Sequence, residues 1–344
     1  MNVSRRWLEE FLRRPLDAKD VAHRLAMLGA PVDAVEPLHT DLADIVVAQV
    51  DEVRPHPDAH SLRVCLVNDG SGTSLQVVCG APNVAAGRRY PFARVGATIP
   101  AGKDGGPAAI KRAKLRGVYS EGMLCSAREL GLGEEHDGIL ELDTDAAPGT
   151  PFLEAVPLAD DRLIVDVTPN RPDLLGHKGI ARELAWSYGV PFRLPAIPGA
   201  EGIDVPPARR AGAAGELGGI RLALEDLDGC RRFHAALIRG ARVGPSPAWL
   251  QRRLEAVGVR SISNVVDATN YVMLELNQPM HAYDAATLRG PALVVRRGRP
   301  GETLATLDGA TRTLDADMTA IADAEGVIGL AGVMGGGRTE VTER

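Results

Sequence analysis

Residues 263–284, SNVVDATNYVMLELNQPMHAYD, combine side chains that can do chemistry with apolar side chains that favour burial. Asn, Asp, Thr, Glu, Gln and His alternate there with Val, Met, Leu and Tyr. Each polar group that is buried without a partner costs about 1–3 kcal/mol. Two explanations are therefore open: a structural network of polar groups, or groups that converge on a ligand.

The individual polar residues of this stretch divide between these two explanations. Asn264 and Asp267 are expected to satisfy backbone groups and to brace the loop. Glu275 and Gln278 are compatible with either role. A lone histidine such as His281 is, from its type alone, more often a structural hydrogen-bonding group than a catalyst.

A second group of chemically active side chains is basic. The run KRAKLRGVYS, residues 111–120, contains no acidic residue. Its cations, with one nearby lysine, are Lys111, Arg112, Lys114, Arg116 and Lys103. In a barrel of short strands, such an edge can follow a phosphate backbone. The alternative is a solvated charged loop, which is the usual role of a charge run.

Length and composition indicate a globular protein of two or three domains. The chain has 344 residues, of which 45% are hydrophobic and 24% are charged. The net charge of −6 excludes a chain that is basic throughout, although a local basic patch could still bind RNA. The 38 Gly and 24 Pro residues predict many turns, and hence strands more than long helical bundles.

Compartment and metal content can also be predicted. The sequence has no apolar run long enough for a membrane span, and its first residues have no signal-peptide core, so a cytoplasmic protein is expected. The four cysteines are widely spaced without a CxxC pair. This spacing favours buried, reduced thiols over a disulfide or a zinc site, and no metal site is predicted in the chain.

The patterns at the two ends of the first 200 residues predict helices and single strands. Helices are expected at residues 3–14, with Ser4 as N-cap, and at 18–28, ended by Gly29. A strand is expected at 162–167. Asn170 or Asp173 could then cap the helix that follows, and Asn170, Arg171 and Asp173 are interpreted as a structural turn cluster.

Between these flanks, short strands with turn signals every 10–15 residues predict a small barrel or sandwich, from IVVAQVDEVRPHP to DGILEL. We interpret it as an insertion into one α+β domain, since insertions are tolerated where chain ends lie close together. The last part mixes expected strands (FHAALIRG, ALVVRRG and MTAIAD) with a helix at SPAWLQRRLEAVG. The predicted domains are 1–39 with 151–199, 40–150 and 215–344.

The inserted block resembles a known family. HPDAHSLRVCLVNDG, QVVCGAPNV, GATIP, IKRAKLRGVYSEGMLCSARELGL and GILEL are similar to the tRNA-binding OB-fold of several synthetases. The resemblance covers about residues 40–150 and implies an OB-fold barrel that binds tRNA. His56, Asp58 and Asn83 lie in these motifs, where structural turn roles are at least as well supported as RNA contacts.

The flanks resemble one larger family. VDVTPNRPDLLGHKGIARELA, the stretch that ends at HAYD and GLAGVMGGGRTEV are similar, in this order, to the beta subunit of bacterial phenylalanyl-tRNA synthetase. The resemblance implies an α+β multidomain protein with an inserted OB-fold and a B3/B4 editing domain. It implies an enzyme assembly that uses ATP and Mg²⁺ to attach phenylalanine to tRNA(Phe), with alpha and beta subunits as α2β2.

The resemblance also implies site residues. Thr269, Asn270 and His281 match positions around the mischarged tyrosine and its ester in the editing pocket, and Gly332 and Gly335 match the glycine-rich wall. Tyr and Phe differ by one hydroxyl, so a second, hydrolytic site is useful. A glutamate that helps to read that hydroxyl lies beyond the glycine-rich loop in the family, and Glu340 and Glu343 are not its equivalents.

The same comparison predicts that the chain is an N-terminal part of the subunit, truncated within the editing domain. The aminoacylation site would then belong to the alpha subunit, and the chain would bind neither ATP nor Mg²⁺ itself. Two alternatives are a non-enzymatic tRNA-binding protein that uses only the OB-fold and a free-standing trans-editing factor.

Overall fold

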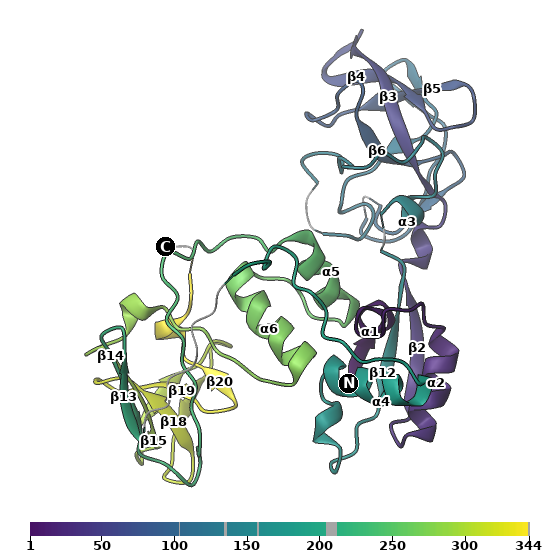
Figure 1. Cartoon of the computed structure of the whole chain (residues 1–344). Helices are drawn as coiled ribbons and strands as arrows, with labels where there is room; N and C mark the ends of the chain where they lie inside the picture. The colour runs from purple at the N-terminus through teal and green to yellow at the C-terminus, as the bar shows by residue number, and fades with distance from the viewer. Residues whose placement is uncertain (103, 134–135, 157, 204–211, 343–344) are drawn as a thin grey trace. The chain divides into compact units, whose positions relative to one another are not determined.

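The structure is a computed structural model that describes residues 1–102, 104–133, 136–156, 158–203 and 212–342 (Figure 1). The chain forms two compact units: residues 37–161, and residues 1–36 together with 162–344. The middle unit is therefore an insertion between two segments that fold together. The limits of the three predicted domains stay predictions, and Lys103 and Glu343 lie outside the described residues.

A five-stranded antiparallel sheet forms the framework of residues 37–161. Its order is β11-β6-β3-β4-β5. The strands are β3 (Ile45–His56), β4 (Ala59–Asn68), β5 (Ser74–Cys79), β6 (Arg89–Ala93) and β11 (Met123–Leu124). The alternating apolar residues of β3, β4 and β6 fill a core around the fully buried Tyr90 and Phe92.

Two small hairpins and two short helical segments complete this unit. They are β7 (Thr98–Ile99) with β8 (Ala108–Ala109), β9 (Ala113–Leu115) with β10 (Val118–Ser120), η1 (Thr40–Leu42) and α3 (Phe152–Ala155). The strand predicted at DGILEL was wrong. That segment is irregular, because its backbone donates isolated hydrogen bonds to three separate places: from Ile139 to the Asn83 side chain, from Leu140 to the Cys125 oxygen and from Leu142 to the Arg89 oxygen.

Single hydrogen bonds connect β5, at one end of the five-stranded sheet, to residues 120 and 121, which precede β11 at the other end. The Glu121 N–H donates to the Gln76 carbonyl oxygen over 2.8 Å, and the Val78 N–H donates to the Ser120 hydroxyl over 3.0 Å. No ladder pairs β5 with β11 among the described residues. The observed fold is thus mixed α/β with an antiparallel sheet, and the closed barrel stays a prediction.

The other unit begins with a three-stranded sheet, β1-β12-β2, covered by helices. Its elements are β1 (Asn2–Ser4), α1 (Arg5–Leu12), α2 (Ala18–Met27), β2 (Val32–Leu38), β12 (Asp160–Val165), η2 (Pro172–Leu174) and α4 (His177–Tyr188). Ser4 caps α1 as predicted, accepting from the Trp7 N–H at 3.0 Å. The helix begins at Arg5 rather than at residue 3, because residues 2–4 pair with β12.

The predicted side-chain cap of α4 was wrong. The N-cap residue is Gly176, which has no side chain that could make a capping hydrogen bond. Asp173 instead accepts from Arg171 at 3.0 Å and from Arg182 at 2.9 Å, which confirms the structural role predicted for Arg171 and Asp173. Glycine is required at 176, where a Cβ would lie 2.8 Å from the Asn277 nitrogen.

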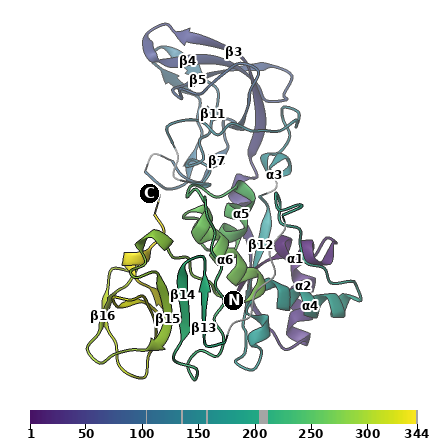
Figure 2. The same ribbon diagram turned by 60° about the vertical axis from the view of Figure 1, so that its left-hand side comes forward.

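A six-stranded sheet follows in the same unit, in the order β13-β14-β15-β18-β19-β20, and Figure 2 shows its first three strands side by side. Its strands are β13 (Ala214–Leu217), β14 (Ile220–Leu224), β15 (Ala292–Arg297), β18 (Thr319–Ala322), β19 (Val327–Leu330) and β20 (Met334–Gly335). β14 and β15 are parallel and the other pairs are antiparallel. Smaller elements here are β16 (Thr303–Ala305) with β17 (Thr311–Thr313), η3 (Ala285–Thr287) and η4 (Gly337–Thr339).

The strands predicted at ALVVRRG and MTAIAD are confirmed as β15 and β18. The strand predicted at FHAALIRG was wrong, and residues 231–247 are irregular. This segment pairs with no strand among the described residues and contacts the sheet through side chains instead. Phe233, for example, packs against the cluster that contains Leu293 and Ile328.

Helices α5 (Ala248–Ala256) and α6 (Asn264–Leu276) pack against the helices of the N-terminal segment (Figure 1). Leu250 and Leu254 of α5 and Tyr271 of α6 join the same buried cluster as Trp7 and Phe11 of α1. The stretch that ends at HAYD therefore begins in a helical core and leads out of it to the six-stranded sheet.

Acidification is expected to destabilise this core through His177. The ring is fully buried, its Nδ1–H donates to the Leu274 oxygen (2.8 Å), and its Nε2 accepts from the Ser4 N–H (3.1 Å). Burial lowers the pKa of His177 from 6.5 to about 4. Between these values only the unfolded chain gains a proton, so the free energy of unfolding falls as the pH falls through this range.

The measurement is the urea midpoint of unfolding between pH about 7 and pH about 4.5. His177→Gln is expected to be less stable at neutral pH and to have a flatter profile. His23→Gln, at an exposed position of α2, is the matched control and should keep the steep profile. An equally steep profile in His177→Gln would contradict the assignment.

Candidate functional site

The buried carboxylate of Asp267 is part of the structural framework of α6. Its Oδ2 accepts from the hydroxyls of Ser246 and Ser261, both at 2.5 Å, and its Oδ1 accepts from the Ile262 N–H at 2.9 Å. Three donors compensate for burying the charge. The prediction that Asp267 braces the preceding loop is confirmed.

Tyr271 and Glu275 follow Asp267 by one and by two helical turns, so all three lie on the same buried face of α6. Glu275 accepts from the Tyr271 hydroxyl and from the Trp7 indole N–H, the latter at 3.0 Å. The Arg253 guanidinium donates to the Tyr271 hydroxyl at 2.9 Å and also pairs with Glu10. The role of Glu275, which the sequence left open, is therefore structural.

The ends of α6 are also fixed by side chains. Asn264 accepts from the Gly244 N–H at 3.3 Å and donates to the Arg242 oxygen at 2.9 Å, which confirms its predicted bracing role. Asn277 ends the helix in a left-handed conformation and donates to the Pro172 oxygen at 2.7 Å. Much of the polarity of residues 263–277 is thus structural, whereas residues 278–281 are exposed.

The segment after α6 brings His281 against the glycine-rich loop. A Cβ built on Gly335 would lie 2.2 Å from the Cε1 of His281 and 2.7 Å from its Nε2, so the imidazole rests directly on the Gly335 backbone. The Tyr283 ring meets the His281 ring edge-on, with centroids 4.5 Å apart and planes at 74°. His281 and Gly335, two of the predicted site residues, are therefore in contact.

Tyr283 is the residue of this site that the sequence analysis missed. Its ring packs against an apolar cluster of Leu288, Leu293 and Ile328. A Cβ on Gly329 would lie 3.4 Å from its hydroxyl oxygen. In the sequence, only the His-x-Tyr spacing indicated that Tyr283 could belong to the site, because this spacing allows both rings to lie on the same side of an irregular segment.

The surroundings of the two rings change their proton affinities in opposite directions. The side chain of His281 is exposed, yet the nearby protein displaces enough water to lower the pKa of the imidazole below its ordinary value. Burial raises the pKa of Tyr283 to about 12. Both effects favour the neutral form, so at neutral pH His281 presents a nitrogen that can accept a proton.

No hydrogen bond joins Thr269 or Asn270 to His281 among the described residues. The Thr269 hydroxyl donates to the Val266 oxygen of its own helix at 2.7 Å. Asn270 is partly buried on α6, and no hydrogen bond from its side chain to a described residue is present. Gly332 has φ +70° in the turn between β19 and β20, with open space where a side chain would be.

The predicted basic edge of the other unit is the β9–β10 hairpin. Leu115 pairs with Val118, so Arg116 and Gly117 form a two-residue turn in which both φ angles are positive, at 42° and 92°. Lys111, Arg112, Lys114 and Arg116 are all exposed, whereas Lys103 lies outside the described residues. Tyr119 of β10 is also exposed and lies beside two of these cations.

His56 and Asn83 have the structural roles expected for them. His56 donates from Nε2 to the Leu115 oxygen at 3.1 Å and accepts at Nδ1 from the Asp58 N–H at 3.1 Å, which fixes the hairpin to the β3–β4 turn. Asn83 donates to the Ile139 oxygen (2.7 Å) and accepts from the Ile139 N–H (3.0 Å).

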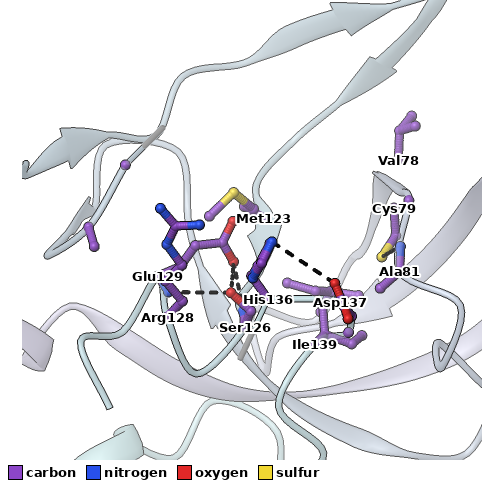
Figure 3. Close-up of a pocket in the computed structure, with 15 residues that line it drawn as sticks. Val78, Cys79, Ala81, Met123, Ser126, Arg128, Glu129, His136, Asp137 and Ile139 are labelled. Atoms are coloured by element: carbon purple, nitrogen blue, oxygen red, sulfur yellow. Dashed lines mark hydrogen bonds and ion pairs between the residues drawn. The ribbon is translucent and has the colours of Figure 1, made fainter. Parts of the chain in front are cut away.

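A cavity of about 450 Å³ lies in the same unit, beside the end of β5 (Figure 3). Glu129 accepts there from the N–H and the hydroxyl of Ser126, at 2.7 and 2.8 Å. The cavity is also lined by Cys79, Arg128 and Ile139. It contains none of the residues that the sequence analysis proposed for either site.

Comparisons with known proteins place the His281 site and the β9–β10 hairpin in two different family models. Residues 45–151 match the tRNA_bind family model of a tRNA binding domain, and residues 229–344 match the B3/4 domain model. The chain is 47% identical over 342 residues to the phenylalanine–tRNA ligase beta subunit of Anaeromyxobacter dehalogenans. It is 44% identical to the corresponding subunits of Moorella thermoacetica and Nitratidesulfovibrio vulgaris.

The chain belongs to the phenylalanine–tRNA ligase beta subunit family. The three alignments cover 99–100% of this chain and 41% of each relative, so the chain spans about two fifths of the length of these beta subunits. The B3/4 match contains His281, Tyr283 and Gly335, and the tRNA binding match contains the β9–β10 hairpin.

Solved structures add little to this assignment of the chain to the beta subunit family. The C-terminal domain of Plasmodium vivax p43 matches 30% of this chain and 56% of its own, with 22% identity and a TM-score of 0.22. A MetRS related protein from Pyrococcus horikoshii matches with a TM-score of 0.23. Scores of this size carry no argument about the fold.

Among the described residues, no group of three or more His, Cys, Asp or Glu side chains could hold a metal ion. Cys65, Cys79 and Cys125 are buried free thiols, and burial raises the pKa of Cys65 to about 12. In the described part of the chain, no helix combines the length and apolarity that a bilayer crossing requires.

Proposed function

We propose that this chain provides two functions of a phenylalanine–tRNA ligase: binding of tRNA by residues 37–161, and hydrolysis of Tyr-tRNA(Phe) at the site around His281. The observation that carries the proposal is the contact of His281 with the Gly335 backbone inside the B3/4 domain. The whole-length relation to beta subunits supplies the reaction class.

For the tRNA-binding function, four exposed cations lie in and just before the hairpin: Lys111 and Arg112 precede β9, Lys114 lies on β9, and Arg116 lies in the two-residue turn. Phosphate contacts of this type require local positive charge rather than a basic chain. We propose that the sheet closes into an OB-fold barrel, which the hydrogen bonds from the Glu121 N–H to Gln76 and from the Val78 N–H to Ser120 support.

For hydrolysis, the neutral imidazole of His281 accepts a hydrogen bond from a water molecule beside the ester. The water oxygen adds to the ester carbonyl carbon, the bond to the ribose oxygen breaks, and that oxygen takes up the proton. Tyr283 holds the imidazole in place from one side and the bare Gly335 backbone from another. Fixed donors near the carbonyl oxygen would stabilise the developing charge, a role for which Thr269 and Asn270 are proposed.

In the complete ligase we propose that this chain works with an alpha subunit, in an α2β2 assembly that uses ATP and Mg²⁺ to join phenylalanine to tRNA(Phe). An apolar pocket rejects a substrate that carries one extra hydroxyl only about a hundredfold. A hydrolytic second site would correct the tyrosine errors that remain. We propose the cytoplasm as the location.

The experiment compares hydrolysis of Tyr-tRNA(Phe) and Phe-tRNA(Phe) by this chain and by the complete ligase. Hydrolysis confined to the tyrosyl ester, and lost in a His281→Ala, Thr269→Ala double variant, is the expected result. Normal clearance of Tyr-tRNA(Phe) by that variant would overturn the proposal. Activity in the chain alone would favour a free-standing editing factor, and tRNA binding without any hydrolysis would favour a binding protein.

Single charge removals in the hairpin should weaken tRNA binding in a salt-dependent way. Lys114→Ala and Arg116→Ala each remove one exposed cation that has no ion pair to a described residue. Each is expected to reduce the slope of log affinity against log salt concentration by about 0.7–0.9. Lys19→Ala, at an exposed position of α2, is the control, and an equal loss there would indicate a nonspecific charge effect.

A further inference from the structure

The β9–β10 hairpin carries an exposed aromatic ring that its own fold does not require. Tyr119 is 45% exposed, and its hydroxyl forms no hydrogen bond to any described residue. The neighbouring Leu115 is 40% exposed. Large apolar side chains that remain exposed next to cations are typical of surfaces that bind a partner.

Two cations lie over the Tyr119 ring. The Arg112 guanidinium carbon is 4.5 Å from the ring centroid and the Lys114 ammonium nitrogen is 5.4 Å from it. Arg112 also pairs with Glu121 at 3.1 Å, which holds its plane in position. We name Arg112, Lys114 and Tyr119 together the hairpin platform.

The backbone under the hairpin platform is fixed from two directions. The Gln76 side chain donates to the Tyr119 oxygen at 2.9 Å, and the Glu121 N–H donates to the Gln76 oxygen at 2.8 Å. His56 holds the Leu115 oxygen on the other strand of the hairpin. A preformed surface of this kind loses little conformational freedom when a ligand binds.

We infer that the hairpin platform stacks an unpaired base of the bound RNA, with the Tyr119 ring against the base and Lys114 against a flanking phosphate. Aromatic rings and guanidinium planes both stack bases, and neighbouring cations follow the backbone. Two acidic groups lie beside the hairpin: Asp58, 3.6 Å from where a Cβ on Gly117 would be, and Glu121, which is already paired with Arg112. This inference rests on the proposed tRNA binding and names the residues that read an unpaired segment.

The experiment measures binding of tRNA(Phe), and of a single-stranded RNA of about eight nucleotides, to the whole chain over a series of salt concentrations. Tyr119→Ala is expected to weaken binding of both RNAs about tenfold without changing the salt slope, because stacking releases no counterions. Tyr119→Phe should retain binding, and Tyr119→Leu should not. Trp186→Ala, which removes an aromatic ring that is 79% exposed elsewhere, is the control.

A photochemical readout locates the contact directly. The same short RNA with 5-iodouridine should cross-link to Tyr119 on irradiation, and the cross-link should move or disappear in Tyr119→Ala. If the unaltered chain binds neither RNA, the proposed tRNA binding fails. If it binds both RNAs and Tyr119→Ala binds them equally well, the stacking inference is overturned while tRNA binding stands.

Discussion

Replacing Gly335 with alanine is expected to lower hydrolysis of Tyr-tRNA(Phe) about a hundredfold, as much as replacing His281 itself. The new methyl group would occupy space 2.2 Å from the imidazole Cε1, so the ring must leave its position. Gly335 is not among the residues with positive φ, so alanine is compatible with the backbone there. The loss should therefore arise from the displaced ring rather than from an unfolded loop.

The measurement is the single-turnover rate of Tyr-tRNA(Phe) hydrolysis by the complete ligase, with the unfolding midpoint as the check on stability. Gly326→Ala is the matched control, because it adds the same methyl group between β18 and β19 where the nearest atom is 4.0 Å away. If Gly335 acts through His281, the Gly335→Ala, His281→Ala double variant should be no slower than either single variant. Multiplied losses, or an active Gly335→Ala, would contradict the proposed site.

The second large effect is expected in stability. Asp267→Ala should lower the free energy of unfolding by about 3–4 kcal/mol, because it leaves two serine hydroxyls and one backbone N–H without their acceptor inside the protein. It also removes the link between the loop before α6 and the helix. The measurement is urea unfolding of the whole chain.

Two comparison variants separate this effect from a simple loss of charge. Asp143→Ala, at an exposed position, should change the free energy of unfolding by no more than about 0.5 kcal/mol. Asp267→Asn retains one acceptor and should cost less than Asp267→Ala. A change below about 1 kcal/mol in Asp267→Ala would show that the polar groups of this stretch do not hold α6 in place.

The sequence predicted most of the helices and strands whose formation depends on a local residue pattern. α2, β2 and β12 were found close to their predicted residues, and Ser4 was identified as a cap from its type and place. The resemblance to beta subunits, and with it the family, was also readable from short motifs. These features depend on neighbours along the chain, such as periodicity, a capping hydroxyl or a glycine after the last turn.

The sequence could not decide features that depend on distant partners. Residues 2–4 continue the apolar pattern of α1, yet they form a strand because residues 162–164 pair with them. FHAALIRG has the composition of a strand but pairs with no strand among the described residues. Local propensity predicts a strand whether or not a neighbouring strand is available to pair with it. Only the assembled sheets therefore show whether such a segment forms a strand.

The candidate sites show the same division. The residue types of His281, Gly335 and the basic run were visible in the sequence, and so was the polarity of the stretch around Asp267. Only the tertiary structure showed that Asp267 and Glu275 face a buried network, that His281 rests on Gly335, and that Tyr119 lies exposed beside Arg112. The physical reason is that a side chain's role is set by what surrounds it, and those surroundings come from segments far apart in the chain.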